Sequence, residues 1–150
     1  MSELITPEFV DLDLDAEDKH AATRRLAELL VAGGRVTDLD GFLADVRARE
    51  EQMSTGLPGG IGIPHAKSMH VVTPTLAFGR SPAGVDFGAD DGPARLVFLI
   101  AAPDGGDSEH LQILAALARR LVSQEFTEAL LSAPDAATVA GIVMREVVPS

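Results

Sequence analysis

The chain alternates between stretches with the two-residue hydrophobic period of strands and stretches with the 3.6-residue period of helices. Residues 95–102 (RLVFLIAA) form a continuous apolar run, which predicts a strand covered on both faces. Residues 9–14 (FVDLDL) alternate apolar with acidic positions and predict a strand with one solvated face. Residues 75–79 predict a further strand, and the Gly-, Pro- and Asp-rich residues 81–92 predict a loop.

Helices are predicted wherever apolar residues recur at helical spacing. Asp15 can cap the first helix, with Asp18 as its capping-box acid, and Thr37 or Asp38 can cap the second. Ser108 can cap a third and longer helix. The predicted helices span residues 15–32, 38–53, 108–122, 124–132 and 136–147. Because helices and strands interleave, we expect the 150 residues to form a single α/β domain built in layers. The strand order does not follow from the pattern.

The most distinctive stretch is GGIGIPHAK, residues 59–67. Ile61 and Ile63 alternate with glycine as in a short buried strand, and Pro64 then interrupts the run because it has no backbone N–H. His65 is therefore predicted to lie at the end of a strand, on a rigid corner. The glycines before it leave room for a second body to approach closely.

Two other side chains are predicted to face inward near the ends of their helices. His110 falls in the middle of the apolar stripe that contains Leu117, and Arg49 shares a helix face with Val46. A partly buried arginine cannot discharge itself and needs an anion or several acceptors. Together with His65, these groups form a receptacle for a small dianion. Phosphate is the natural candidate, because the start of the third helix adds oriented N–H groups.

The chemistry of such a receptacle follows from the histidine. An imidazole keeps at least one unprotonated nitrogen near neutral pH, so His65 can attack a phosphoryl group without a separate strong base. His110 can donate N–H bonds to the phosphoryl oxygens, and Arg49 can neutralise charge in the transition state. A phosphorylated imidazole remains a reactive donor, which suits the relay of phosphoryl groups.

Each of these residues also has a plainer interpretation. His110 can be a core histidine bonded to a carbonyl, and Arg49 can extend past its helix to pair with Glu50 or another surface acid. His20 is interpreted as a solvent-facing helix residue, and His70 as structural or exposed.

A metal site is a further alternative. His65, His70 and His110, with Asp104 or Asp107, can imitate a set of metal ligands, but the chain has no recognised ligand spacing. A metal-dependent hydrolase is therefore kept only as a third hypothesis, and neither a metal nor a cofactor is expected.

Composition narrows the possible partners. The net charge of −11 repels nucleic acid and anionic lipid, and the absence of Tyr and Trp removes the aromatic platforms that bases and sugar rings require. The chain contains no cysteine, which gives no sign of an oxidising compartment. No segment resembles a signal peptide or a membrane span, so a cytoplasmic protein is expected.

The motifs resemble a known family. STG at residues 54–56, GGIGIPHAK, and the block VDFGADDGPARLVFLIAAPDGGDSEHLQILAALARRL at residues 85–121 resemble the fructose/mannitol-type enzyme IIA (EIIA) domain. This domain belongs to the bacterial phosphoenolpyruvate-dependent sugar phosphotransferase system (PTS). The resemblance extends over nearly the whole chain, and the IPHAK corner is its most specific part.

The resemblance implies the roles of individual residues. His65 would accept a phosphoryl group from the small carrier HPr and pass it to a cysteine of an enzyme IIB (EIIB) domain. His110 would hold the phosphoryl oxygens, Arg49 would lie near them, and Thr55 would place a hydroxyl close by. The resemblance also implies a mixed β-sheet flanked by helices, EIIB on a separate polypeptide, and a role in sugar uptake. Regulatory, nitrogen-type relatives resemble the same domain, so control of protein partners by phosphorylation is the alternative.

Overall fold

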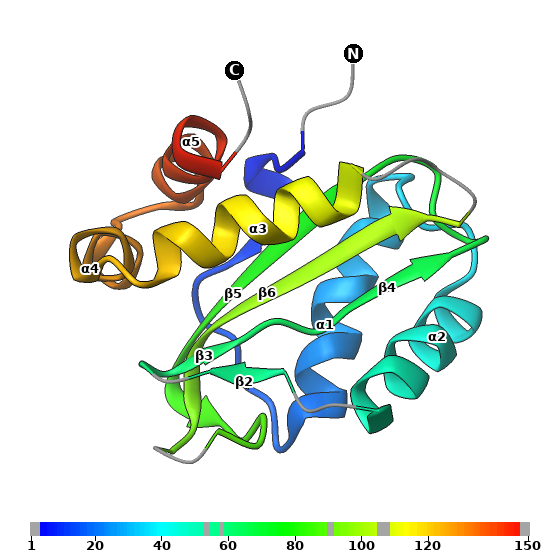
Figure 1. Ribbon diagram of the computed structural model, residues 1–150, viewed down its shortest axis with the longest axis horizontal. Coiled ribbons are helices and arrows are strands. Elements are labelled where there is room, and N and C mark those ends of the chain that lie inside the picture. Colours follow the sequence, from blue (N-terminus) through cyan, green and yellow to red (C-terminus); the bar gives the residue numbers. More distant parts are fainter. Residues whose placement is uncertain (1–3, 53–54, 58, 90–91, 105–108, 148–150) are drawn as a thin grey trace.

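The computed structural model describes residues 4–52, 55–57, 59–89, 92–104 and 109–147 (Figure 1). A short 3₁₀ helix at Pro7–Phe9 comes first. The α-helices are α1 (Lys19–Ala32), α2 (Leu39–Gln52), α3 (Glu109–Leu121), α4 (Gln124–Ser132) and α5 (Ala136–Val147). The strands are β1 (Val10–Asp11), β2 (Gly56–Leu57), β3 (Ile61–Gly62), β4 (His65–Ser68), β5 (Thr75–Val85) and β6 (Ala94–Pro103).

The strands form one mixed, six-stranded sheet in the order β1-β5-β6-β3-β2, and β4 also pairs with β6. Strand β6 is antiparallel to β5 and parallel to both β3 and β4. Helices α1 and α2 lie on one face of the sheet and α3 lies on the other (Figure 1). The expected layered α/β domain with a mixed sheet flanked by helices is confirmed.

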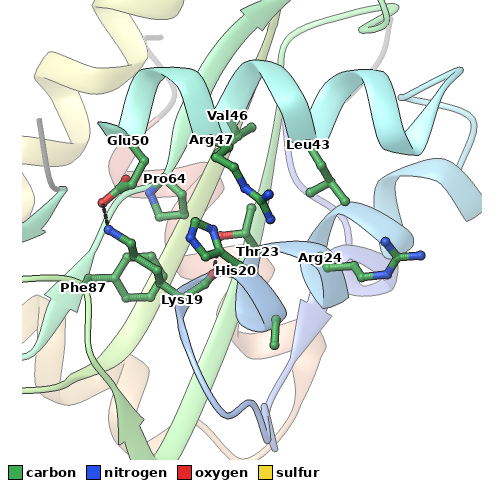
Figure 2. Close-up of a pocket in the computed structure, with 11 residues that line it drawn as sticks. Lys19, His20, Thr23, Arg24, Leu43, Val46, Arg47, Glu50, Pro64 and Phe87 are labelled. Carbon is green, nitrogen blue, oxygen red and sulfur yellow. Dashed lines mark hydrogen bonds and ion pairs between the residues drawn. The ribbon is translucent and has the colours of Figure 1, made fainter. Parts of the chain in front are cut away.

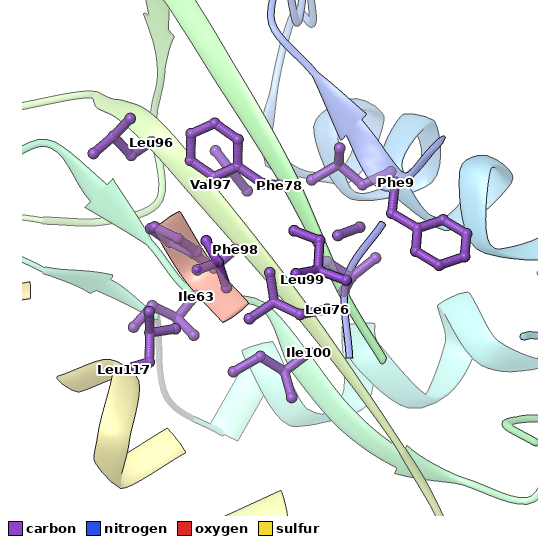
Figure 3. Packing of buried hydrophobic residues seen from close by; sticks show 14 of the residues in the cluster. Phe9, Ile63, Leu76, Phe78, Leu96, Val97, Phe98, Leu99, Ile100 and Leu117 are labelled. Atoms are coloured by element: carbon purple, nitrogen blue, oxygen red, sulfur yellow. The ribbon is translucent and has the colours of Figure 1, made fainter. Parts of the chain in front are cut away.

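The core is centred on β5 and β6. The rings of Phe78 and Phe98 lie 5.1 Å apart between centroids, in the tilted arrangement that aromatic pairs favour (Figure 3). Leu99 of β6 and Leu117 of α3 are also fully buried. Burying a side chain of this size contributes about 1.5–3 kcal/mol, so β6 anchors both layers. The apolar run at residues 95–102 therefore forms the expected strand covered on both faces.

The sequence was wrong about two strands. Strand β1 covers only two residues, because Pro7 starts a 3₁₀ helix that takes Phe9 out of the predicted strand. Strand β5 continues through part of the predicted loop as far as Val85, after a bulge that follows Arg80. The continuation exists because Val85 pairs with Ala94, at the start of β6, a long-range contact that local composition does not reveal.

The helices agree more closely. Helix α1 begins later than predicted, because Asp18 rather than Asp15 caps it by accepting a 2.8 Å hydrogen bond from the Ala21 N–H. Asp38 caps α2, as one of the two predicted alternatives, by accepting from the Gly41 N–H. Helices α4 and α5 have the predicted bounds. The expected cap Ser108 lies outside the described residues.

None of the helices in the described part of the chain is long and apolar enough to cross a membrane.

Candidate functional site

His65 lies at a strand end, as predicted, but as the first residue of β4, so the pairing does not end at Pro64. Strands β3 and β4 pair with consecutive parts of β6, with Ile61 opposite Leu96 and His65 opposite Ile100. Pro64 has no backbone N–H to donate to the ladder. Its carbonyl oxygen still accepts a 3.0 Å hydrogen bond from the Ile100 N–H. The corner is therefore attached to the central strand on both sides of the proline.

Gly62, which precedes this corner, packs closely against the interior of the protein. A Cβ atom at Gly62 would lie only 2.7 Å from the ring of Phe87, which is itself 1% exposed. At Gly62 the predicted room for a second body is thus filled by the protein's own Phe87, whereas a Cβ at Gly59 or Gly60 would meet nothing closer than 3.7 Å. The close approach fixes β3 against the segment that follows β5.

The His65 ring is held by two contacts, one at each nitrogen. Nδ1 lies 2.8 Å from the carbonyl oxygen of Ile63, and the Arg49 Nε lies 3.4 Å from Nε2. A carbonyl oxygen only accepts, so Nδ1 is the protonated nitrogen and Nε2 keeps its lone pair. The ring is half-buried. The nitrogen that faces Arg49 is therefore the nucleophilic one.

Arg49 is exposed on α2, so its predicted inward orientation is wrong. The buried face of the helix runs through the neighbouring residue at position 50 instead, yet the Arg49 guanidinium still reaches His65. Besides His65, it donates from Nη1 to the Gln52 side-chain oxygen at 3.2 Å. The alternative in which Arg49 pairs with Glu50 is wrong: within the described residues, Glu50 bonds to Lys19 and Thr55 instead. Arg49 and His65 thus come together from α2 and β4.

The buried side chain at this end of α2 is Glu50, which the sequence reasoning did not single out. Glu50 is 6% exposed, and it continues the buried stripe of Phe42 and Val46. The regular spacing of four residues is the signal that would have identified it. Its two carboxylate oxygens accept from the Thr55 backbone N–H at 2.9 Å and from the Thr55 hydroxyl at 2.7 Å.

Thr55 lies close to the site, but its hydroxyl proton is directed to Glu50. Its carbonyl oxygen accepts a 3.1 Å bond from the Ile63 N–H, two residues before His65. Thr55 thus connects the end of α2 to the histidine corner. A direct hydrogen bond from Thr55 to a phosphoryl group stays a prediction.

The other histidines are placed as follows. His110 is the second residue of α3, but its side chain lies outside what the structure describes, so its role stays a prediction. His20 is exposed on α1, as expected. His70 packs against the start of α2, where a Cβ at Gly41 would meet its ring, and its Nδ1 lies 4.0 Å from Asp38. This position agrees with the structural interpretation of His70.

Within the described residues, no three His, Asp or Glu side chains are placed to hold a metal ion. His110 and Asp107, which the metal hypothesis also invokes, fall outside the described side chains.

A cavity of about 190 Å³ lies beside the site, between α1 and α2. Pro64 and Phe87 form part of its wall, and Lys19 reaches the Glu50 carboxylate at 3.5 Å at the same end (Figure 2). Glu50 and its partner Lys19 therefore both line this cavity.

The chemistry that this arrangement allows is nucleophilic attack by the imidazole on an electrophilic phosphorus atom. It presents an imidazole nitrogen with a free lone pair, and a guanidinium group close enough to bind oxygens attached to that nitrogen. The guanidinium is planar and permanently charged, which suits it to a phosphoryl group.

Comparison with known proteins shows what the chain is similar to. Residues 3–145 match the family described as "Phosphoenolpyruvate-dependent sugar phosphotransferase system, EIIA 2". A curated relative from Haloferax volcanii, "PTS system fructose-specific EIIA component", is 46% identical over 146 residues, which cover 96% of this chain and 94% of the relative.

Two solved structures have the same fold. The nitrogen regulatory protein IIA-Ntr from Neisseria meningitidis has a TM-score of 0.84 at 29% identity, covering 93% of this chain and 96% of that protein. The mannitol enzyme IIA from Escherichia coli, solved in complex with phosphorylated enzyme IIB, has a TM-score of 0.76 at 28% identity. That comparison covers 91% of this chain and 94% of the enzyme IIA chain.

Proposed function

The chain belongs to the EIIA 2 family of the phosphoenolpyruvate-dependent sugar phosphotransferase system, whose members are phosphotransferases that act through a phosphohistidine; on this premise we propose that His65 is its phosphoryl acceptor. The observation that carries the proposal is the orientation of the ring. Nδ1 is bound to the Ile63 carbonyl and Nε2 is directed at Arg49, so the nucleophilic nitrogen faces the arginine that can bind the phosphoryl oxygens.

In the acceptance step, the Nε2 lone pair of His65 attacks the phosphorus of the donor, for which we propose phospho-HPr. The new N–P bond forms as the P–N bond of the donor histidine breaks, and the released electron pair stays on that histidine. Arg49 exchanges its 3.4 Å contact with Nε2 for contacts with the phosphoryl oxygens, where negative charge gathers. The proton stays on Nδ1 throughout, where it is hydrogen-bonded to the Ile63 carbonyl oxygen.

In the donation step, a cysteine thiolate of an EIIB domain attacks the same phosphorus, and the N–P bond breaks to regenerate neutral His65. An EIIB partner is supported by the enzyme IIA of Escherichia coli, which was solved in complex with phosphorylated enzyme IIB. The fructose-specific relative supports fructose as the transported sugar. We expect His110 to bind the phosphoryl oxygens from the start of α3, and the transfer to occur in the cytoplasm during sugar uptake.

The test is phosphorylation by a defined system. The protein is incubated with phosphoenolpyruvate, the general transfer enzyme and HPr, and intact mass is measured. We expect a gain of one acid-labile phosphoryl group that His65→Ala abolishes and the exposed control His20→Ala leaves unchanged. Acid-labile phosphorylation of the His65→Ala protein would contradict the assignment.

A regulatory role is the second candidate, favoured by the likeness to the nitrogen regulatory protein. His65 would carry the same phosphoryl group, but its phosphorylation state would control binding to another protein. Affinity capture with the phosphorylated and unphosphorylated forms distinguishes the roles. Capture of an EIIB domain supports transport, and capture of a different protein by only one form supports regulation.

A further inference from the structure

We propose that Glu50 is a positioning residue for phosphoryl transfer. Its buried carboxylate holds Arg49 and His65 in position relative to each other without touching the reacting atoms. This inference rests on the proposed function of His65. It concerns a residue outside the set of Arg49, His65, His110 and Thr55 that the sequence indicates.

Glu50 is a buried acid with an unusually complete set of partners. Only 6% of the residue is exposed, and its two oxygens together accept from the Thr55 N–H, the Thr55 hydroxyl and the Lys19 ammonium group. Figure 2 shows Lys19 reaching the carboxylate from the start of α1. A carboxylate in this setting is costly to bury unless it is paired, and here three donors compensate it.

The network continues to the histidine through two short steps. The carbonyl oxygen of Thr55 accepts from the Ile63 N–H at 3.1 Å, and the carbonyl oxygen of Ile63 binds His65 Nδ1 at 2.8 Å. Each link holds the next one in place. The contact that selects the nucleophilic nitrogen of His65 is therefore connected to Glu50 through Thr55.

The second route from Glu50 to the site is covalent. Arg49 precedes Glu50 at the end of α2, so the anchored carboxylate fixes the backbone from which Arg49 extends toward His65. Within the described residues, no hydrogen bond or ion pair joins Glu50 directly to His65 or to the Arg49 side chain. Glu50 therefore acts on both partners of the site by holding their supports.

The chemistry of the side chain decides which substitutions should be tolerated. Glu50→Ala leaves the Thr55 N–H and hydroxyl without their acceptors and releases the connection between α2 and β2. Glu50→Gln can accept the Thr55 N–H through its carbonyl oxygen and donate its amide N–H to the Thr55 hydroxyl. Glutamine loses the ion pair with Lys19 and the acceptor of the Thr55 hydroxyl proton, but it keeps a hydrogen bond to each Thr55 group and should largely restore the geometry.

The experiment compares Glu50→Ala and Glu50→Gln with Arg80→Ala, a control that removes partly buried hydrogen bonds to the end of α4. Nitrogen NMR of the unphosphorylated proteins reports the tautomer of His65, and quenched-flow kinetics with phospho-HPr give kcat and KM. For Glu50→Ala we expect a mixture of tautomers, a fall in kcat of about 10- to 100-fold and an unchanged KM. Glu50→Gln should keep the native tautomer and a kcat within about 3-fold of the native value.

Arg80→Ala should lower the melting temperature without changing the tautomer or kcat. If Glu50→Ala does not fold, Thr55→Val removes one of the two Thr55 donors to Glu50 and should shift the tautomer in the same direction. An unchanged tautomer and kcat in Glu50→Ala, or equal effects of Glu50→Ala and Arg80→Ala, would overturn the proposal. The NMR measurement requires no phosphoryl transfer, so it separates this inference from failure of the proposed function.

Discussion

Two arginines of this protein illustrate the difference between a structural role of this side chain and the functional role that we propose for it. Arg80, on β5, donates through Nη1 to three backbone carbonyls at the end of α4, those of Leu130, Leu131 and Ala133, at 2.8–3.1 Å. Arg49 makes one long contact to His65 and one to Gln52, and it is exposed. The first is tied to three backbone carbonyls, whereas the second can be redirected to an incoming anion.

The comparison suggests a criterion for the functional arginine. Carbonyls at a helix C-terminus have no partner within the helix, so Arg80 completes the hydrogen bonding of α4 and cannot leave without cost. Arg49 contacts a ring nitrogen and an amide oxygen, both of which can bond to water instead. A weakly engaged cation beside a nucleophile is the arrangement that transition-state stabilisation requires.

The largest effect that we expect is the loss of phosphoryl transfer in the Arg49→Ala variant. We expect the rate of phosphorylation of His65 to fall by about 100-fold, because one positive donor to the phosphoryl oxygens is lost. The melting temperature should stay within about 1 °C of the native value, because an exposed side chain contributes little to stability. Stopped-flow kinetics and thermal unfolding measure the two quantities on the same samples. A variant that loses stability as much as Arg80→Ala does would remove the distinction between the arginines.

The converse is expected for Arg80→Ala. Loss of the charged hydrogen bonds at the end of α4 should lower the free energy of unfolding by about 2 kcal/mol, measured by urea denaturation. The rate of His65 phosphorylation should remain unchanged, because Arg80 contacts no residue of the site. Arg80→Lys is the matched control: it keeps the charge but lacks the planar guanidinium group, and we expect an intermediate loss. A slowed phosphorylation in Arg80→Ala would show that the two regions are coupled.

Asp135 extends the comparison to a side chain that is hydrogen-bonded but exposed. Like Arg80, it is held by more than one hydrogen bond. Hydrogen bonds from the Thr138 hydroxyl and then from the Thr138 backbone N–H lower the pKa of Asp135 below its ordinary value of 3.8. A group whose pKa is lower in the folded state stabilises the fold above its unfolded pKa, and this contribution disappears as the pH falls through the folded value.

The third and smallest prediction follows from this sign. The difference in unfolding free energy between native protein and Asp135→Asn should be small at pH 7, and it should diminish as the pH falls below the unfolded pKa of an aspartate, about 3.9, and through the lowered folded pKa. Urea denaturation across the acidic range measures it, with Asp13→Asn as an exposed control. A difference that grows toward low pH would contradict the lowered pKa.

Much of the fold was accessible from the sequence wherever local pattern and final environment agree. Residues 95–102 become the central strand because their apolar side chains suit a position between two layers of helices. Helices α4 and α5 have the predicted bounds because Ser123, Pro134 and Asp135 mark their ends in the sequence itself. The continuation of β5 to Val85 was missed because it depends on pairing with Ala94, nine residues further along the chain.

The proximity of Arg49 and His65 was predictable from the sequence, but the residues that support them were not. The family resemblance implied that Arg49 lies near the site, and the structure brings the two side chains together, although helix periodicity wrongly predicted that Arg49 faces inward. Glu50 was overlooked because a glutamate beside an arginine is usually a solvated surface residue. Only the tertiary structure shows that its carboxylate is enclosed and that both Thr55 donors reach it.

The attachment of β3 and β4 to β6 has a consequence for protein synthesis. The histidine corner, residues 61–68, is paired on this side only with residues 96–103, which leave the ribosome some thirty-five residues later. A nascent chain that has not yet released β6 therefore lacks the scaffold that orients His65. With His65 as the proposed phosphoryl acceptor, we therefore expect phosphorylation by a carrier to require that β6 has joined the sheet.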